Sequence, residues 1–304
     1  MSVTIYDFTG IYENEGFDFY DKESSRSLLD AEKPEANDEH SDFLFGAEEI
    51  AKDVGHSGFL FDAREKVSDD KSDYLSLKDI SGTNCICDEY AYDFIKNKAV
   101  QLTPPNEYVH KISFFDNGNY HYMSKILIDV MCEKLSSGEQ LPFDLIVFDH
   151  HTDMKWTSYG EILSCGSWIL NTLKDRPELN RVFIVGADEG LVKETQDEFP
   201  EYDGRVFFLS DISRLQNYDF GKVYISVDKD VLSPDEIKTN WDQGNMSITQ
   251  LQDALNYLNQ RFGSDILAID VCGECLPDSE DAYGELGIGS SNRVNRMILD
   301  IFNC

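Results

Sequence analysis

An apolar segment that leads directly into three side chains able to bind a metal is the most informative stretch of this 304-residue chain. Residues 145–148 read Leu-Ile-Val-Phe, and Asp149, His151 and Asp153 follow as a D-x-H-x-D cluster. An apolar run of this length predicts one buried strand, so the cluster is expected where a parallel strand ends. Two carboxylates and an imidazole in that position are typical of a metal site on an α/β sheet. Short polar clusters after strands are also ordinary loop chemistry, so this cluster needs partners.

The partners come from two other segments. Residues 223–227 are strand-like and lead into Asp228 and Asp230. Because alternate residues of a strand face the same way, both carboxylates can point at one ion or at one pair of ions. A histidine follows the turn after a third predicted strand, residues 111–115. The candidate metal ligands are therefore His121, Asp149, His151, Asp153, Asp228 and Asp230.

Each of these residues has a plain explanation when it is taken singly, since aspartates often cap helices and a histidine beside a tyrosine is usually packed. Together, four carboxylates and two imidazoles at strand ends need a cation, because buried anions so close together repel one another. Mixed carboxylate and imidazole ligation suits Mn²⁺ or another first-row divalent ion. The many oxygen ligands argue against a thiolate zinc site.

The elements that must position these ligands alternate between strands and helices. The apolar patterns predict strands at residues 3–8, 111–115, 143–149, 181–185, 205–209, 222–228 and 266–271, and helices at residues 120–135, 167–174, 191–199 and 248–262. Continuous apolar strands separated by helices predict a three-layer α-β-α fold with a mostly parallel sheet. We expect one domain over residues 1–304, with residues 12–76 forming an acidic, loop-rich and partly helical N-terminal elaboration.

Charge limits the classes of partner. The chain has 26 basic and 58 acidic residues, for a formal net charge of −32. Such a surface repels phosphate backbones and anionic lipids, so neither nucleic acid nor a membrane is an expected partner, whereas a small cationic substrate would be attracted. No apolar stretch reaches the roughly 20 residues of a membrane span, and no secretory signal is visible. Seven scattered cysteines suit reduced thiols, which predicts a cytoplasmic location.

The cysteine motifs are less informative than the carboxylates. Cys272 and Cys275 form a C-x-x-C after the predicted strand 266–271, but the loop-like residues 276–278 follow where a redox dithiol would need a helix. A zinc cage completed by Cys85 and Cys87 would depart from the usual spacing of two C-x-x-C arms. Neither a redox motif nor structural zinc is favoured.

The order of the metal motifs resembles the ureohydrolase family, which includes arginase, agmatinase and formimidoylglutamase. That family carries a G-G-D-H-like turn, then D-A-H-x-D, S-x-D-x-D and E-x-x-P. The corresponding stretches are residues 118–121, 149–153, 226–230 and 274–277, and the resemblance covers residues 111–277. The two aspartate-rich motifs are specific in this order, whereas the first and last motifs match loosely.

This resemblance implies an arginase-like fold, two Mn²⁺ ions and hydrolysis of linear C–N bonds in a guanidino, amidino or formimidoyl compound by a metal-bridging hydroxide. By the resemblance, one ion would take His121, Asp149, Asp153 and Asp228, and the other would take His151, Asp149, Asp228 and Asp230, so that Asp149 and Asp228 bridge. Asp230 is then essential for catalysis, and Glu274 matches the acidic residue that orients the cationic substrate.

The chain also departs from the family pattern. Cys165 stands where the family places a proton-shuttling histidine, and a thiol is a poorer acid–base group near neutral pH than an imidazole. We keep Cys165 as a catalytic candidate, with three explanations open: another group protonates the leaving amine, the substrate differs, or turnover is weak. Tyr120 replaces the acidic residue before the histidine of the first turn, and residues 154–159 do not match the arginase segment that recognises an amino acid.

Two other functions stay open beside the hydrolase. A metal-binding or regulatory protein that has lost catalysis would explain Cys165 and the acidic N-terminal region. An amide deacetylase would share the α/β architecture, although the complete two-metal ligand set argues against a single-metal deacetylase. Ureohydrolase-like chains often form oligomers, so the resemblance also leaves a homo-oligomer open.

Overall fold

The computed structural model of the chain describes residues 2–23, 25–27, 72–102, 111–135, 141–157, 160, 162–280, 282 and 284–302. Residues 28–71 make up most of the predicted N-terminal elaboration and lie outside the described residues, so its loop-rich character stays a prediction. The end of that segment, residues 73–76, is an unpredicted strand of the central sheet.

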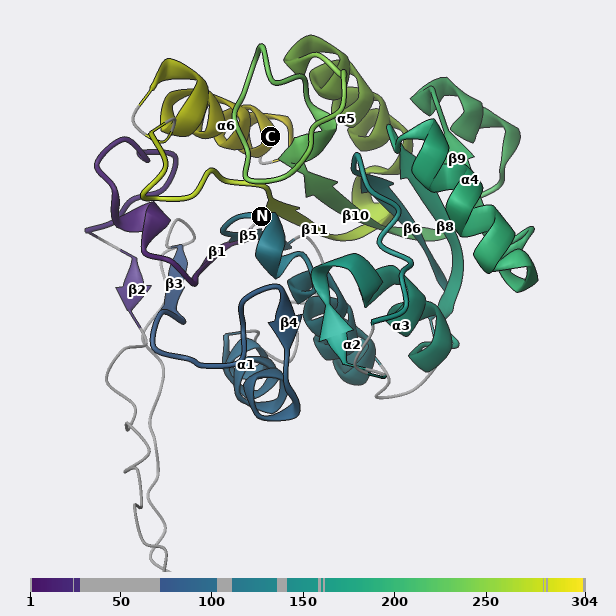
Figure 1. Cartoon of the computed structure of the whole chain (residues 1–304), viewed down its shortest axis with the longest axis horizontal. Coiled ribbons are helices and arrows are strands. Elements are labelled where there is room, and N and C mark those ends of the chain that lie inside the picture. Colours follow the sequence, from purple (N-terminus) through teal and green to yellow (C-terminus); the bar gives the residue numbers. More distant parts are fainter. Residues whose placement is uncertain are drawn as a thin grey trace, which may run out of the picture.

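Within the described residues, a sheet of nine strands forms the centre of the molecule (Figure 1). Its order is β2-β3-β1-β5-β11-β10-β6-β8-β9, and every neighbouring pair is parallel. The strands are β1 (Ser2–Asp7), β2 (Arg26–Ser27), β3 (Asp73–Ser76), β5 (Lys111–Phe115), β6 (Phe143–Phe148), β8 (Leu179–Val185), β9 (Val206–Leu209), β10 (Lys222–Asp228) and β11 (Ile266–Cys272). A separate antiparallel pair consists of β4 (Ile86–Cys87) and β7 (Leu163–Ser164).

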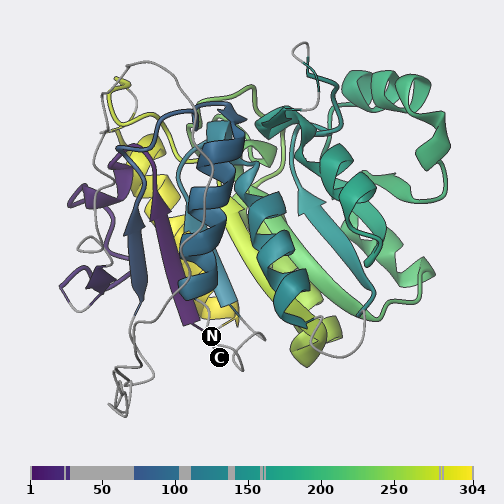
Figure 2. The same cartoon turned by 90° about the horizontal axis from the view of Figure 1, so that it is seen from below.

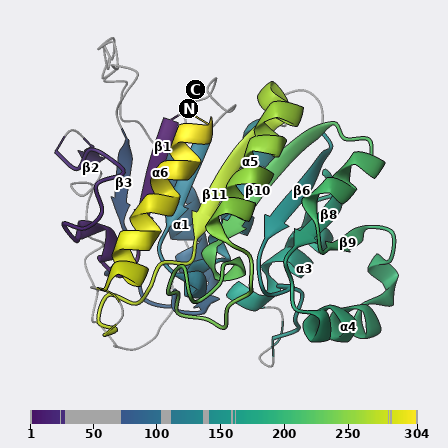
Figure 3. The same cartoon turned by 90° about the horizontal axis from the view of Figure 1, so that it is seen from above.

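Helices cover both faces of the sheet, as a parallel sheet requires. They are α1 (Glu89–Gln101), α2 (Met123–Leu135), α3 (Trp168–Asp175), α4 (Glu189–Glu198), α5 (Ile248–Phe262) and α6 (Ser290–Phe302). Figure 2 shows α1 and α2 across one face, and Figure 3 shows α5 and α6 across the other. The predicted three-layer α-β-α fold is confirmed. None of the described helices has both the length and the apolar composition needed to cross a membrane.

Short helical turns connect many of these elements. They are η1 (Ile11–Glu13), η2 (Gly118–Tyr120), η3 (Cys165–Ser167), η4 (Pro200–Tyr202), η5 (Ile212–Asn217), η6 (Lys229–Val231), η7 (Gly263–Asp265) and the π-helical turn η8 (Glu285–Gly289). Two of them, η2 and η6, follow β5 and β10 and carry residues of the predicted metal motifs.

Alternation along the central strand divides the apolar core in two. Val223, Ile225 and Val227 of β10 belong to the core that includes α5 and α6, whereas Tyr224 belongs to the core that includes α1, α2 and α3. This period of two is the strand geometry that the apolar run predicted. Because β10 is buried on both faces, its end is held rigidly where it enters η6.

The strands that precede the predicted ligands are neighbours in the sheet. The order β5-β11-β10-β6 places the ends of β5, β10 and β6 within four adjacent positions. All four strands are parallel, so their carboxyl ends meet at one edge. Ligands of open α/β sheets gather at this edge.

Core packing against this sheet makes a stability prediction. Leu255 of α5 is fully buried, whereas Leu276 is 38% exposed. We expect Leu255→Ala to lower the free energy of unfolding by about 2–5 kcal/mol, because it removes buried apolar contacts and leaves a cavity. Leu276→Ala serves as the matched control, with an effect within about 0.5 kcal/mol. Urea unfolding followed by circular dichroism measures both, and equal effects would contradict this packing.

Candidate metal centre

All six predicted metal ligands lie around one cavity of about 150 Å³ at the carboxyl edge of the sheet. His121 follows η2, Asp228 ends β10, and Asp230 lies in η6. The other three ligands, Asp149, His151 and Asp153, lie in the loop after β6. The remaining residues of the cavity wall are Gly118, Lys155, Cys165, Gly166 and Trp241. Segments up to 109 positions apart in the sequence, from His121 to Asp230, thus meet in one small volume.

The ligands form two groups that share Asp149. The Nδ1 atom of His121 lies 3.2 Å from Oδ2 of Asp149 and 3.0 Å from Oδ2 of Asp153. The Nδ1 atom of His151 lies 3.4 Å from Oδ1 of Asp149 and 2.9 Å from Oδ2 of Asp230. Each group offers its ligand atoms within 4.8 Å of one another. Asp149 therefore faces both groups with different oxygens, as a bridging carboxylate would.

Asp228 forms a third candidate group with His121 and Cys272, which shares His121 with the first group. Its Oδ2 atom lies 3.4 Å from Nδ1 of His121, while its Oδ1 atom accepts a hydrogen bond from the backbone N–H of Asp230. The structure thus brings Asp228 into the centre, but it does not place this carboxylate between the two groups in the way it places Asp149.

Burial of so much negative charge fits a site for divalent cations. The carboxylate residues Asp149, Asp153, Asp228 and Asp230 are at most 6% exposed. The Oδ2 atom of Asp149 is buried without a hydrogen-bond partner in the described part of the chain. Uncompensated carboxylates in a dry interior are strongly unfavourable. Four such charges equal the charge of two divalent ions, and carboxylate with imidazole is the donor set that first-row ions accept.

The pKa values of the candidate ligands also indicate a site that needs positive charge. Burial, followed by the charges of Asp228 and Asp149, raises the pKa of Asp230 well above its ordinary value. Burial opposes charge on His151, but hydrogen bonds to Asp149 and Asp230 outweigh it and raise the pKa of His151 to about 11. Protons therefore occupy positions that a cation would take, and metal binding would displace them.

Comparison with known proteins bears on this centre. No protein-family model and no curated protein matches the chain. Solved structures do match: formimidoylglutamase from Bacillus subtilis (TM-score 0.55, 14% identity, 78% of this chain and 73% of that chain), Helicobacter pylori arginase (0.53, 11%, 77% and 86%) and a Trypanosoma cruzi formiminoglutamase variant with Mn²⁺ (0.53, 12%, 76% and 76%). The chain has an arginase fold. The predicted resemblance is confirmed at the level of the fold, and agmatinases are among the other matching structures.

Side chains behind the ligands of this arginase fold hold them in place. Ser226 lies 3.1 Å from Nε2 of His121, the ring nitrogen opposite the carboxylates. Trp168 donates from Nε1 to Oδ2 of Asp153 at 2.6 Å, and Cys272 donates its thiol to Oδ2 of Asp228 at 3.2 Å. Such contacts fix ring orientation and ligand basicity.

Sequence reasoning did not assign these supporting roles. Ser226 belongs to the S-x-D-x-D motif, so its position was readable, but its contact with His121 spans 105 positions. Cys272 ends β11 at the same sheet edge, and that strand end was the available signal for its approach to Asp228. Trp168 begins α3, and neither a motif nor a strand end indicated its contact with Asp153.

Backbone strain marks one ligand. Asp153 has a φ of 47°, in the left-handed region that residues with a side chain rarely adopt. Two contacts from α3 hold it there: Nε1 of Trp168 donates to its side chain, and the backbone N–H of Ile169 donates to its carbonyl at 3.2 Å. Strained residues of this kind concentrate at functional sites.

Glu274, the predicted substrate-orienting residue, does not line the cavity. It is fully buried, and Nζ of Lys229 lies 2.5 Å from its Oε1 atom. Tyr12 and Asn295 donate to the same oxygen at 3.0 Å each, and the Ser291 hydroxyl donates to the other oxygen. The substrate-orienting role needs a carboxylate that faces the cavity, whereas this carboxylate already has an internal cation.

The position of Lys229 between two candidate ligands explains where Glu274 lies. Asp228 and Asp230 face the cavity, and Lys229 points to the other side, where it also donates to Ser291 at 2.9 Å and Asn295 at 3.1 Å. Sequence reasoning treated this lysine as a free position of the S-x-D-x-D motif. A fully buried ammonium needs a carboxylate partner, and Glu274 supplies it.

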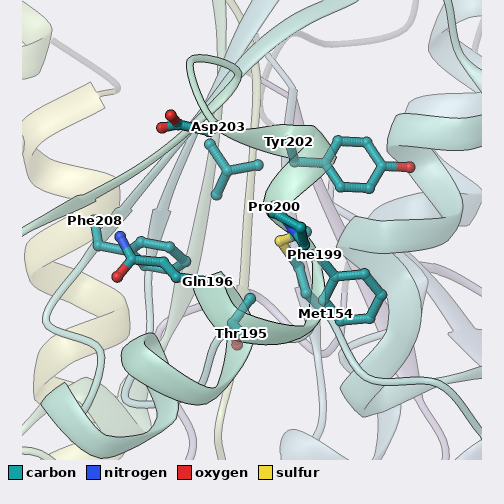
Figure 4. A pocket seen from close by; sticks show the side chains of 9 residues that line it. Met154, Thr195, Gln196, Phe199, Pro200, Tyr202, Asp203 and Phe208 are labelled. Atoms are coloured by element: carbon teal, nitrogen blue, oxygen red, sulfur yellow. The ribbon is translucent and has the colours of Figure 1, made fainter.

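Figure 4 shows the side chains that line a second, larger cavity. It measures about 340 Å³ and is lined by Met154, Thr195, Gln196, Phe199, Pro200, Tyr202, Asp203, Val206 and Phe208. Met154 directly follows the ligand Asp153. This lining includes one carboxylate and no imidazole or thiol, so the candidate metal ligands lie at the smaller cavity.

The pKa of Asp153 predicts how metal binding depends on pH. Burial and the charge of Asp149 raise this pKa to about 6, so the contribution of Asp153 to metal-free stability is present below its unfolded pKa and lost as pH rises through 6. A divalent ion needs the ionised form. We expect the increase in Tm caused by Mn²⁺ to be larger at about pH 7.5 than at about pH 5. A pH-independent increase in thermal unfolding scans would contradict this. Asp153→Asn should show a smaller increase and a weaker pH dependence, because one of the groups that must lose a proton is gone.

The Lys229–Glu274 pair makes a second prediction. Lys229→Met leaves a buried carboxylate without its cation and should lower the free energy of unfolding by about 3–5 kcal/mol. The double variant Lys229→Met with Glu274→Gln should recover most of that loss, because no buried charge remains. Lys193 on α4 is exposed, so Lys193→Met is a matched control with an effect within about 0.5 kcal/mol. Chemical denaturation distinguishes these outcomes, and a Lys229→Met protein as stable as the control would refute the pair's importance.

Proposed function

We propose that this protein is a dinuclear, manganese-dependent hydrolase of linear C–N bonds in a guanidino, amidino or formimidoyl compound. The observation that carries the proposal is the pair of ligand groups that share Asp149 at the carboxyl edge of the sheet. Support comes from the matching solved structures, whose names include arginase, formimidoylglutamase and proclavaminate amidino hydrolase. One of them contains Mn²⁺.

The residues present fit two ions. His121, Asp149, Asp153 and Asp228 would hold one, and His151, Asp149 and Asp230 would hold the other. The resemblance alone adds Asp228 as a ligand of the second ion. When bound, two ions would lower the pKa of a shared water and supply hydroxide near neutral pH. The chain itself contributes orientation: Trp168 fixes Asp153, and Ser226 fixes the ring of His121.

A small cation is the proposed substrate. The net charge of −32 favours the approach of cations, and the cavity of about 150 Å³ admits a group the size of a guanidinium. Because Glu274 already pairs with Lys229, recognition of the substrate's charge falls to groups that line the cavity. Trp241 is one of them, and its ring lies 5.7 Å from that of His151. An indole face at a cavity wall binds cations well.

Two side chains of the cavity wall can protonate the leaving amine. Besides the metal ligands, the wall includes Cys165 and Lys155, each of which carries a dissociable proton. Cys165 is the residue that matches the family's proton-shuttling histidine in sequence order. Lys155 is a second donor, which the sequence analysis did not assign. It would be the other group that protonates the leaving amine if Cys165 does not. Proton transfer to the amine is needed because an unprotonated amine is a poor leaving group.

The test is a substrate screen on protein loaded with Mn²⁺. Guanidino, amidino and formimidoyl compounds are supplied, and released urea, ammonia or formamide is measured. We expect hydrolysis by the native chain and a loss of at least about 100-fold in Asp149→Asn and Asp230→Asn, because each change removes a ligand. Asp253→Asn, on the exposed face of α5, is the control that should keep full activity.

Metal analysis of the same samples separates the alternatives. If the protein binds two ions per chain but hydrolyses no compound in the screen, the hydrolase proposal fails and a metal-binding regulatory protein becomes the better explanation. If it binds no divalent ion, the metal centre itself is refuted.

A further inference from the structure

Two cysteines from distant segments face each other at the wall of the metal cavity. Cys85 precedes β4 and Cys165 follows β7, and these two strands pair antiparallel with Ile86 opposite Ser164. The next step of this register places Cys85 opposite Cys165. The backbone N–H of Cys165 donates to the carbonyl of Cys85 at 3.0 Å, which fixes the two residues together. The two thiols are also hydrogen-bonded to each other, so their sulfur atoms are in contact, as disulfide formation requires.

The two thiols differ in character and in access. A hydrogen bond between them lowers the pKa of Cys85 to about 7, with burial opposing the shift, and the same bond raises the pKa of Cys165. Both residues are partly exposed, and both thiols are free. Cys165 lines the metal cavity. An accessible thiol with a lowered pKa therefore lies beside a thiol with a raised pKa, which is the arrangement of a reactive thiol with a resolving thiol.

The other described cysteines lack these properties. Cys87, Cys132, Cys272 and Cys275 are buried. Burial raises the pKa of Cys87, Cys132 and Cys275 to about 12 in each case, and that of Cys272 well above its ordinary value. Buried thiols of this kind are inert. Thiol chemistry is thus confined to Cys85 and Cys165 among the described residues.

Hydrogen bonds connect the turn that contains Cys85 to a residue of the cavity wall. Its neighbour Asn84 accepts a hydrogen bond from Asn119 at 2.8 Å, and Asn119 in turn accepts one from Nε1 of Trp241 at 2.9 Å. Trp241 lines the cavity. Cys85 also has a φ of 61°, so its backbone leaves the strand direction at this point. The thiol pair therefore lies in a fixed turn that contacts the cavity through both Cys165 and Trp241.

We propose that Cys85 and Cys165 form a redox-active dithiol at the wall of the metal cavity. With a peroxide as oxidant, the Cys85 thiolate attacks one peroxide oxygen, the O–O bond breaks, and hydroxide leaves, which gives a sulfenic acid on Cys85. The Cys165 sulfur then attacks the Cys85 sulfur, and its proton leaves with the hydroxyl group as water. The two thiols are oxidised by two electrons to one disulfide, and the peroxide is reduced.

Oxidation has a consequence for the cavity that rests on the proposed function. The disulfide uses the Cys165 sulfur, so the cavity wall loses one of its two proton donors besides the metal ligands. Hydrolysis would fall in the oxidised protein and return on reduction. The disulfide itself does not depend on any hydrolytic activity.

Mass spectrometry of the full-length protein tests the dithiol. The reduced protein is treated with hydrogen peroxide, free thiols are alkylated after unfolding, and the peptides are analysed. We expect a peptide pair linked through Cys85 and Cys165, with the four buried cysteines alkylated. Cys87→Ser is the matched control and should form the same link, whereas Cys165→Ser should stop at a sulfenic acid on Cys85 that dimedone labels. Full alkylation of Cys165 in peroxide-treated native protein, or a link to another cysteine, would overturn the proposal.

Two further measurements distinguish failure of the dithiol from failure of the proposed hydrolytic activity. The rate of Cys85 alkylation by iodoacetamide should reach half its maximum near pH 7 in the native chain and at a higher pH in Cys165→Ser, and equal profiles would refute the thiol contact. In the substrate screen, oxidised protein should lose at least about 10-fold in rate and recover with dithiothreitol. A disulfide that forms in a protein without hydrolytic activity would refute the proposed function and leave the dithiol standing.

Discussion

Mutual repulsion of four buried carboxylates is the constraint on which the rest of this structure depends. Asp149, Asp153, Asp228 and Asp230 are almost fully buried at one edge of the sheet, where their charges oppose folding unless cations or protons compensate them. A parallel sheet buried on both faces supplies the rigidity that keeps them together. The same compensation explains the raised pKa of His151, since a proton on its imidazole offsets part of the negative charge of Asp149 and Asp230.

Sequence predicted the elements that obey strong local rules. The strands 111–115 and 222–228 match β5 and β10 residue for residue, because their apolar runs have no competing explanation. Helix α5 spans the predicted residues 248–262, and Ser247 and Gln250 form a capping box at its start. Helices α1 and α6 have no counterpart among the predicted elements, although the spacing of Ala91, Ile95 and Ala99 on α1 was a readable signal.

The positions of the candidate metal ligands at one sheet edge were predictable and their surroundings were not, for one physical reason. Ligands follow strands directly, so strand order and alternation decide where they point. The contact of Glu274 with Lys229, and that of Cys85 with Cys165, depend on which turns come together after folding. A motif fixes residue types over five positions, whereas these contacts join segments 45 and 80 positions apart. The resemblance gave Glu274 a substrate-orienting role, but no motif indicated its ion pair with Lys229.

Because side chains alternate at the end of β10, the residues of the S-x-D-x-D motif contact two separate parts of the molecule. Its aspartates face the metal cavity, while its variable middle position faces Ser291 and Asn295 of α6. A lysine in that position changes the charge behind the sheet without moving a ligand. A sequence motif that accepts any residue at this position still identifies the candidate metal ligands. It does not register Lys229, whose ion pair determines whether Glu274 can contact a substrate.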